Sequence, residues 1–103
     1  MAVAASITVV ASGTTDVAGL AAAAGRRLLG FSIQEDAGAP AVAEAKLRLG
    51  TLVSDTEIAF ISLAASGAQT VWFGDRGIDA SAGVFFERVT GTTVLALYHT
   101  TGA

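Results

Sequence analysis

The sequence predicts an all-β fold, an antiparallel β-sandwich of about seven strands, and three observations support this prediction. Turn signals rich in Gly, Ser, Thr and Asp recur roughly every ten residues. The runs between them are short and rich in β-branched, aliphatic and aromatic residues. Several runs alternate apolar and polar residues with a period of two, as half-buried strands do. A jelly-roll-like arrangement is one form open to such a sandwich.

Seven runs are predicted to form the strands. In chain order they are residues 6–12, 26–35, 44–50, 57–64, 69–74, 83–89 and 93–100. The run 44–50 is the clearest, because three charged residues, Glu44, Lys46 and Arg48, alternate with apolar ones. This pattern predicts a strand with one buried and one solvated face.

Two further runs carry predictions about burial. In 26–35 the alternation places Leu29, Phe31 and Ile33 on one face. Leu28 is then expected on the opposite face, together with Gly30. In 57–64 apolar residues occupy both faces, which predicts a central strand or one covered by another layer or subunit.

The C-terminal third carries most of the aromatic side chains. Adjacent residues of a strand point to opposite faces, so one member of Trp72–Phe73 and of Phe85–Phe86 can fill the core. The other member needs different cover. Trp72, Phe85 and Tyr98 are the residues we expect to face a partner, since aromatic residues are enriched at protein interfaces. The alternative is a stacking platform for a sugar or a base.

The remaining segments are turns, a helix candidate and the ends of the domain. Residues 89–93 predict a hairpin turn in which Gly91 supplies positive φ, so that 84–89 and 93–100 pair antiparallel. Residues 17–25 are alanine-rich and are the one candidate for a helix, of at most two turns. The chain is expected to be a single domain, with residues 1–15 an N-terminal strand or arm and residues 16–103 the β-sandwich.

Composition excludes several classes of function. The chain has 103 residues, six Lys plus Arg and a net charge of −3, which argues against binding to nucleic acid or to an anionic membrane. It has no cysteine, so disulfides and thiolate chemistry are excluded. Apolar residues make up 52% and charged residues 15%, against about 25% charged in an ordinary domain. This excess of apolar surface predicts a permanent interface.

The polar candidates for chemistry are few, and we expect no cofactor or metal. Asp75, Arg76 and Asp79 form either a small acid–base or calcium loop or a polar turn, and the sparse carboxylates favour the turn. His99 is the only histidine, and we expect it at a surface or interface rather than in catalysis. Arg26 and Arg27 are expected to be surface charges, or to hold a carboxylate across an interface. An enzyme would need a cleft that joins His99 to the 75–79 loop.

The order of these segments resembles that of a known group of proteins. "GRRLLGFSIQED", followed later by "VWFGDRGIDASAGVFFERVTGTTVLALYHT", is similar to small virion proteins of tailed bacteriophages and prophages. The shared pattern is an Arg-Leu strand with a "GFS" core, a "WFG…GI" loop, a Gly-hydrophobic-aromatic strand ending in "GT", and a final aromatic strand. The resemblance runs from about Gly25 to Thr100.

This resemblance implies a β-sandwich structural subunit of a virion, and no catalytic residues belong to its pattern. We expect a decoration (cement) or minor capsid protein that binds the major capsid protein on assembled capsids, as a homo-oligomer, a trimer or a dimer. It would be made in the host cytoplasm and reside on the capsid surface. The N-terminal segment would then fit an arm that adds to a neighbouring sheet. The alternative is a tail- or fibre-associated module that binds host-surface carbohydrate through Trp72 or Tyr98.

Overall fold

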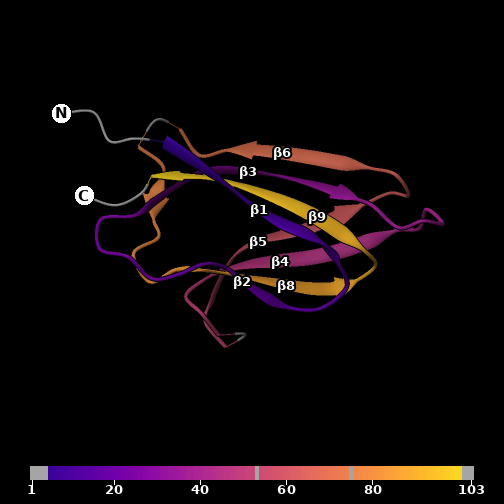
Figure 1. The fold of residues 1–103 in the computed structure, drawn as a ribbon, viewed down its shortest axis with the longest axis horizontal. Coiled ribbons are helices and arrows are strands. Elements are labelled where there is room, and N and C mark those ends of the chain that lie inside the picture. The colour runs from indigo at the N-terminus through magenta and orange to yellow at the C-terminus, as the bar shows by residue number, and fades with distance from the viewer. Residues whose placement is uncertain (1–4, 53, 75, 101–103) are drawn as a thin grey trace.

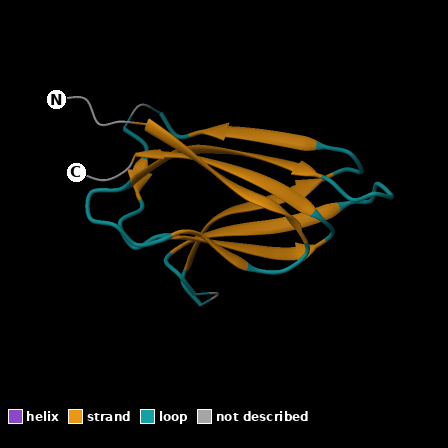
Figure 2. Cartoon of the chain, viewed as in Figure 1, coloured by secondary structure: helices purple, strands orange, loops and turns teal. Residues whose placement is uncertain are grey.

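The protein is an all-β sandwich, seen in a computed structural model that describes residues 5–52, 54–74 and 76–100. The described residues contain nine strands and no helix (Figure 2). The strands are β1 (Ala5–Gly13), β2 (Val17–Leu20), β3 (Arg27–Glu35), β4 (Ala43–Leu49), β5 (Thr56–Leu63), β6 (Ala68–Trp72), β7 (Ile78–Asp79), β8 (Val84–Thr90) and β9 (Thr93–Thr100). All seven predicted strands are therefore present, and β2 and β7 are short additions to them.

The strand order is that of a jelly roll (Figure 1). One sheet has the order β1-β9-β3-β6, with the short β7 also paired to β3, and the other has the order β2-β8-β4-β5. Without β7, the chain pairs β1 with β9, β2 with β8, β3 with β6 and β4 with β5, all antiparallel. Such nested pairing is a long hairpin folded over on itself into two sheets, which is the jelly-roll arrangement.

The core lies between the two sheets and is built by the inward residue of each alternating pair. Phe31 and Ile33 from β3 and Leu95 and Leu97 from β9 are buried against Phe86 of the facing sheet. The predicted alternation of β4 is confirmed. Ala45 and Leu47 are fully buried, and the charged residues that alternate with them are partly exposed. The predicted turn at Gly91 is confirmed, because Gly91 has a φ of 81° between β8 and β9. The predicted antiparallel pairing of 84–89 with 93–100 is wrong, because β8 lies between β2 and β4 in one sheet and β9 lies between β1 and β3 in the other. The turn therefore carries the chain from one sheet to the facing one.

The predicted face of Leu28 is wrong, because a β-bulge interrupts β3. Leu28 is opposite His99 on β9, whereas Gly30 is opposite the next residue, Tyr98, so Leu29 is an extra residue in the ladder. A bulge of this kind reverses the alternation on one side of it. Leu28 is consequently in the core together with Phe31, and the side chain of Leu29 borders the outer face beside Trp72.

Two other expectations are corrected by the sheet order. The run 57–64 is not a central strand, because β5 is an edge strand of its sheet. Phe60 is exposed on the outer side of β5, so cover by another subunit stays a prediction. The helix candidate 17–25 begins with β2, which pairs with β8. Ala18 and Leu20 there are held by strand pairing with the aromatic β8, a non-local contact that outweighs the helix propensity of alanine.

The N-terminal segment is a strand of the domain itself. Residues 5–10 pair without interruption with the last strand, from Ala5 opposite Thr100 to Val10 opposite Leu95. Of the two options for residues 1–15, a strand or an arm, the strand is thus the observed one for 5–13, and residues 1–4 lie outside the described residues.

Arg88 is a charged side chain that lies inside the sandwich, a position not predicted from the sequence. Its guanidinium donates to the carbonyl oxygens of Ala11 (2.6 Å), Thr15 (3.0 Å) and Thr93 (2.9 Å) and lies 4.9 Å from the ring centroid of Phe86. Burial lowers the pKa of Arg88, and the charge of Asp16 partly opposes this effect. The guanidinium therefore joins the end of β1 and the β1–β2 connection to the start of β9.

Glu35 lies at the same end of the sandwich as Arg88. Its carboxylate accepts hydrogen bonds from the backbone N–H of Ser66 and of Ala37, each at 2.7 Å. These bonds, that from Ser66 first, hold the pKa of Glu35 below its ordinary value of 4.5. The carboxylate thus ties the end of β3 to the turn between β5 and β6.

Replacement of Glu35 by glutamine should make the protein less stable near neutral pH and less sensitive to acid. Because the folded-state pKa of Glu35 is lowered, its stabilising effect is present above the unfolded-state pKa and is lost as pH falls through the folded-state pKa. The difference in unfolding free energy between wild type and Glu35→Gln should therefore shrink on acidification below about pH 4. Urea unfolding at a series of pH values measures it, and a difference that is constant with pH would contradict the assignment.

Candidate protein-binding surface

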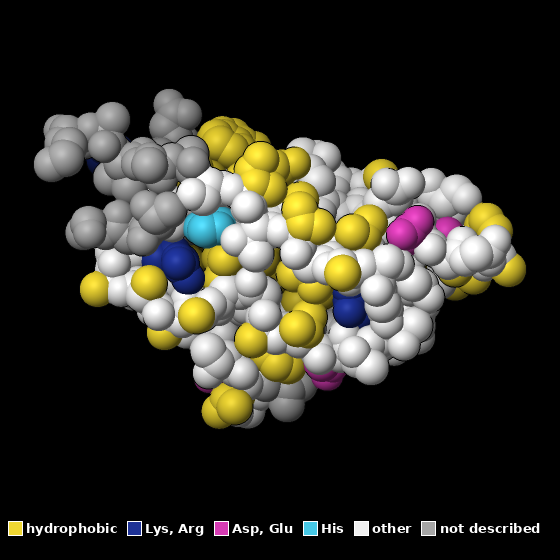
Figure 3. Space-filling model, in the orientation of Figure 1, with side chains coloured by type: hydrophobic (Ala, Val, Ile, Leu, Met, Phe, Trp, Pro, Cys, Tyr) yellow, Lys and Arg dark blue, Asp and Glu magenta, His cyan; other side chains and the backbone are white. Residues whose placement is uncertain are grey.

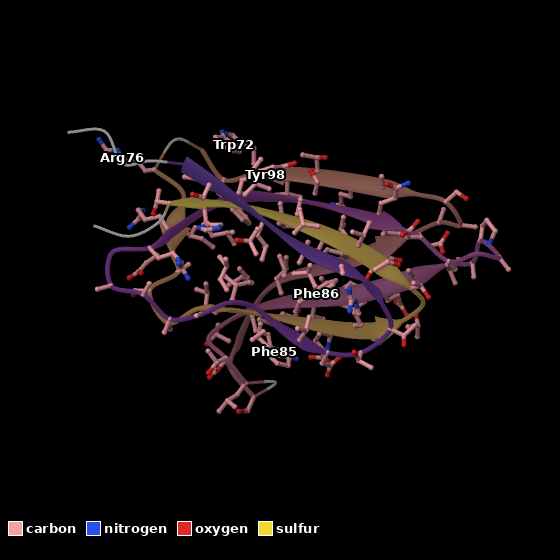
Figure 4. All side chains as sticks on the ribbon, in the orientation of Figure 1. Trp72, Arg76, Phe85, Phe86 and Tyr98 are labelled. Carbon is pink, nitrogen blue, oxygen red and sulfur yellow. The ribbon has the colours of Figure 1, made fainter. Side chains whose placement is uncertain are left out.

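The structure brings two of the three predicted partner-facing aromatic residues together. Trp72 on β6 and Tyr98 on β9 lie on the outer face of the same sheet (Figure 4). Phe85, on β8, is half-buried on the outer side of the other sheet, and its neighbour Phe86 points into the core. Phe85 consequently cannot share a flat contact with Trp72 and Tyr98, so the predicted set of three divides between two faces.

A row of four residues crosses the sheet at the level of Trp72. Ile7 on β1 is opposite Tyr98, Tyr98 is opposite Gly30, and Gly30 is opposite Trp72. A Cβ at position 30 would clash with the carbonyl of Val71 and lie 3.0 Å from Cε3 of Trp72, so the absence of a side chain at Gly30 lets the indole lie against the sheet. Trp72 is nonetheless 58% exposed.

The next row is smaller and its polar groups are already bonded. It runs from Val9 through Ala96 and Ser32 to Thr70. The Ser32 hydroxyl forms hydrogen bonds with the hydroxyls of Thr70 (3.0 Å) and Tyr98 (2.9 Å). These bonds satisfy polar atoms within the surface and lower the cost of covering it with another molecule.

We call this surface the uncharged face. Its residues are Ile7, Val9, Gly30, Ser32, Gln34, Ala68, Thr70, Trp72, Val94, Ala96 and Tyr98. None of them is Lys, Arg, Asp or Glu. Hydrophobic side chains gather over β1 and β6 in the upper part of the view (Figure 3). The face is hollowed by a depression of about 430 Å³ lined by Ser6, Ile7, Leu29, Trp72 and Tyr98.

The outer face of the other sheet has the opposite character. Arg48 forms an ion pair with Glu87 at 2.8 Å, and Lys46 forms one with Glu57 at 3.5 Å. Lys46 also lies 5.9 Å from the ring centroid of Phe60. These four charges are paired with one another across strands, as on a solvated surface. The two sheets therefore present chemically different outer faces.

Arg26 and Arg27 bind carbonyl groups of their own chain. Arg27 donates through Nε to the carbonyl of Arg76 and through Nη2 to that of Gly77 (3.3 Å), and Arg26 donates to the carbonyl of Ala21. They secure the loop between β6 and β7 and the connection that follows β2. The expected contact with a partner's carboxylate stays a prediction.

The loop of Asp75, Arg76 and Asp79 behaves as a turn where it is described, and Asp75 lies outside the described residues. Asp79 accepts hydrogen bonds from the backbone N–H (2.9 Å) and the hydroxyl (2.7 Å) of Ser81, and these bonds lower the pKa of Asp79. Within residues 5–52, 54–74 and 76–100, no group of three or more His, Asp or Glu side chains is placed to hold a metal ion.

The expectation that His99 lies at a surface or an interface is wrong, because its side chain is buried inside the domain. His99 is only 4% exposed. Its Nδ1 donates to the carbonyl of Thr100 (2.9 Å), which leaves Nε2 to accept from the hydroxyl of Thr8 (2.8 Å). His99 thus joins the two terminal strands, β9 and β1, from the inner side of their sheet.

Two exposed residues of the uncharged face, Ile7 and Val9, were not predicted from the sequence. They are 63% and 64% exposed, while the polar Ser6 and Thr8, which alternate with them, are on the inner side of the sheet. The alternation in this run was visible, but the usual rule that apolar residues point inward would have assigned its faces the wrong way round. From Ser6 to Val9, β1 is therefore inverted in polarity, whereas Val10 is apolar and lies in the core.

Comparison with known proteins found no family model that matches the chain and no curated protein that matches it. Among the described residues, no helix is long and apolar enough to cross a membrane.

Proposed function

We propose that the chain is a structural protein of a phage virion that binds the assembled capsid through its uncharged face. The observation that carries the proposal is the contrast between the two outer faces, of which one is charged and internally paired and the other uncharged and partly apolar. The resemblance to small virion proteins supplies the class of partner, the major capsid protein. Jelly rolls occur in viral capsid proteins and in lectins, so the fold is compatible with this role.

The uncharged face is suited to a protein partner on energetic grounds. Covering it removes no ion from water, and the hydroxyls of Ser32 and Tyr98 keep their mutual hydrogen bond. Trp72 supplies a large apolar area that lies against the sheet at Gly30 and loses little freedom on binding. A protein that binds the assembled lattice and not its free subunits stabilises the lattice by mass action.

A second candidate function is supported by the depression beside Trp72. An exposed indole next to Tyr98 is a surface on which a sugar ring can stack. The depression has few free polar groups, however, because its lining is Ser6, Ile7, Leu29, Trp72 and Tyr98, and the Tyr98 hydroxyl is bonded to Ser32. The protein partner is therefore the stronger proposal.

Replacement of Trp72 by alanine should weaken binding to capsids by roughly tenfold to thirtyfold, the effect of losing a central aromatic anchor. Co-sedimentation with capsids assembled from the major capsid protein of the encoding phage measures this affinity. The matched control is Phe60→Ala, since Phe60 is 52% exposed on the charged sheet. Equal loss in both variants, or no binding by wild type, would defeat the proposal. Glycan binding that depends on Trp72 in the absence of capsid binding would establish the second candidate instead.

A further inference from the structure

The free edge of β1 differs from the other sheet edges of the molecule. β1 is nine residues long and contains no charged residue and no proline. Among the other edges, β2 has four residues and β6 has five, and β5 carries Glu57 in an ion pair with Lys46. Natural sheets protect their edges with short strands, charges or proline. β1 is the one edge of the two sheets that is both long and uncharged.

The outward position of the aliphatic residues Ile7 and Val9 of β1 also indicates that its edge pairs with another strand. Ile7 and Val9 are the most exposed large side chains on the uncharged face, and they lie on its outermost strand. On the inner side, Thr8 is bonded to His99, so the strand is anchored in this orientation and cannot turn its aliphatic residues inward. β9 flanks Ile7 and Val9 on one side, and a further strand beyond β1 would flank them on the other side.

We propose that this further strand is β1 of a second copy of the chain, paired antiparallel about a two-fold axis at Thr8. In that register Ile7 is opposite Val9 of the second copy, Thr8 is opposite Thr8, and Ser6 is opposite Val10. The aliphatic pairs and the Thr–Thr pair are favourable cross-strand combinations. Because the strand has no charge, it meets itself without like-charge repulsion. The ladder of β1 with β9 is regular from Ala5 to Val10, which covers all five positions of the pairing.

The resulting dimer has one continuous sheet of eight main strands, four from each copy, with two uncharged faces side by side. Dimerisation does not depend on capsid binding. A Trp72 variant distinguishes the two, because Trp72 lies on β6, at the opposite edge of the sheet from β1. If both hold, the dimer binds with two linked surfaces and gains affinity by multivalency.

Sedimentation equilibrium of the full chain tests the proposal. Wild type should be a dimer, and Val9→Lys should raise the dimer dissociation constant by roughly tenfold or more, because two symmetric aliphatic pairs are lost. The matched control is Val89→Lys, since Val89 is also exposed, at 42%, but lies on the charged sheet. Thermal unfolding establishes that both variants fold. A monomeric wild type, or a dimer that Val9→Lys does not weaken more than Val89→Lys, overturns the proposal.

A cross-linking experiment tests the register, because the chain has no cysteine of its own. In the proposed pairing, Ile7→Cys in one copy lies opposite Val9→Cys in the other. An oxidised mixture of these two variants should form a mixed disulfide faster than either variant alone, since the Cβ atoms must lie about 3.5–4.5 Å apart. Equal rates in the mixture and in the separate variants would overturn the register about Thr8.

Discussion

Replacement of Phe86 by alanine is expected to lower the free energy of unfolding by about 3–5 kcal/mol, the usual cost of removing a buried aromatic ring. Phe86 is fully buried on the inner side of β8, in register with Val17 on β2 and Leu47 on β4. Its ring also supports the guanidinium of Arg88. Urea-induced unfolding followed by circular dichroism measures the loss, and a domain of this size should remain close to two-state.

The neighbouring residue provides the control. Phe85→Ala removes the same ring from the same strand, but Phe85 is on the outer side, where it is half-buried and in register with Arg48. We expect this variant to lose about 1 kcal/mol or less. Equal losses in the two variants would contradict the alternation of β8 on which the assignment of inner and outer faces rests.

Replacement of Arg88 by methionine is expected to cost about 3 kcal/mol, since it removes the donor to the buried carbonyl of Thr93 and to two partly buried carbonyls. Methionine keeps the apolar stem, but it cannot donate to the carbonyl oxygens of Ala11, Thr15 and Thr93. The connection between β1 and β2 should loosen first. Urea unfolding gives the total loss, and hydrogen exchange at residues 11–16 tests its location.

Arg88→Lys separates the charge of Arg88 from its shape. A lysine ammonium is a compact donor and does not reproduce the planar fork that reaches several carbonyls at once. We expect the lysine variant to fall between wild type and Arg88→Met. A methionine variant as stable as wild type would mean that burial of the guanidinium costs as much free energy as its hydrogen bonds return.

The sequence predicted the strands well, since their signals are local. The alternation of Glu44, Lys46 and Arg48 and the turn at Gly91 depend on neighbours in the chain, and the structure confirms both. The pairing expected between the two strands that flank Gly91 does not form, because the sheet order places β8 and β9 in different sheets. The same holds for Trp72, whose outward position follows from the alternation of its own strand.

The errors concern features that depend on distant parts of the chain. The bulge at Leu29 is defined by the register with β9, and nothing in the residues around Leu28 reveals it. β5 is an edge strand because the sheet order gives it β4 as its only neighbour, and the run 57–64 does not reveal this order. Burial of His99 depends on Thr8, some ninety residues earlier. The division of Trp72 and Phe85 between two faces is likewise a result of topology.

The pairing of the first described strand with the last one also has a consequence for synthesis on the ribosome. β1 pairs only with β9, so its backbone groups have no native partner until nearly the whole chain has emerged. Contacts this distant in sequence form slowly, and an unpaired apolar strand is prone to associate with other chains in the meantime. The rate at which the nascent protein completes this sheet should therefore limit the yield of soluble material, and slower growth at low temperature should favour it.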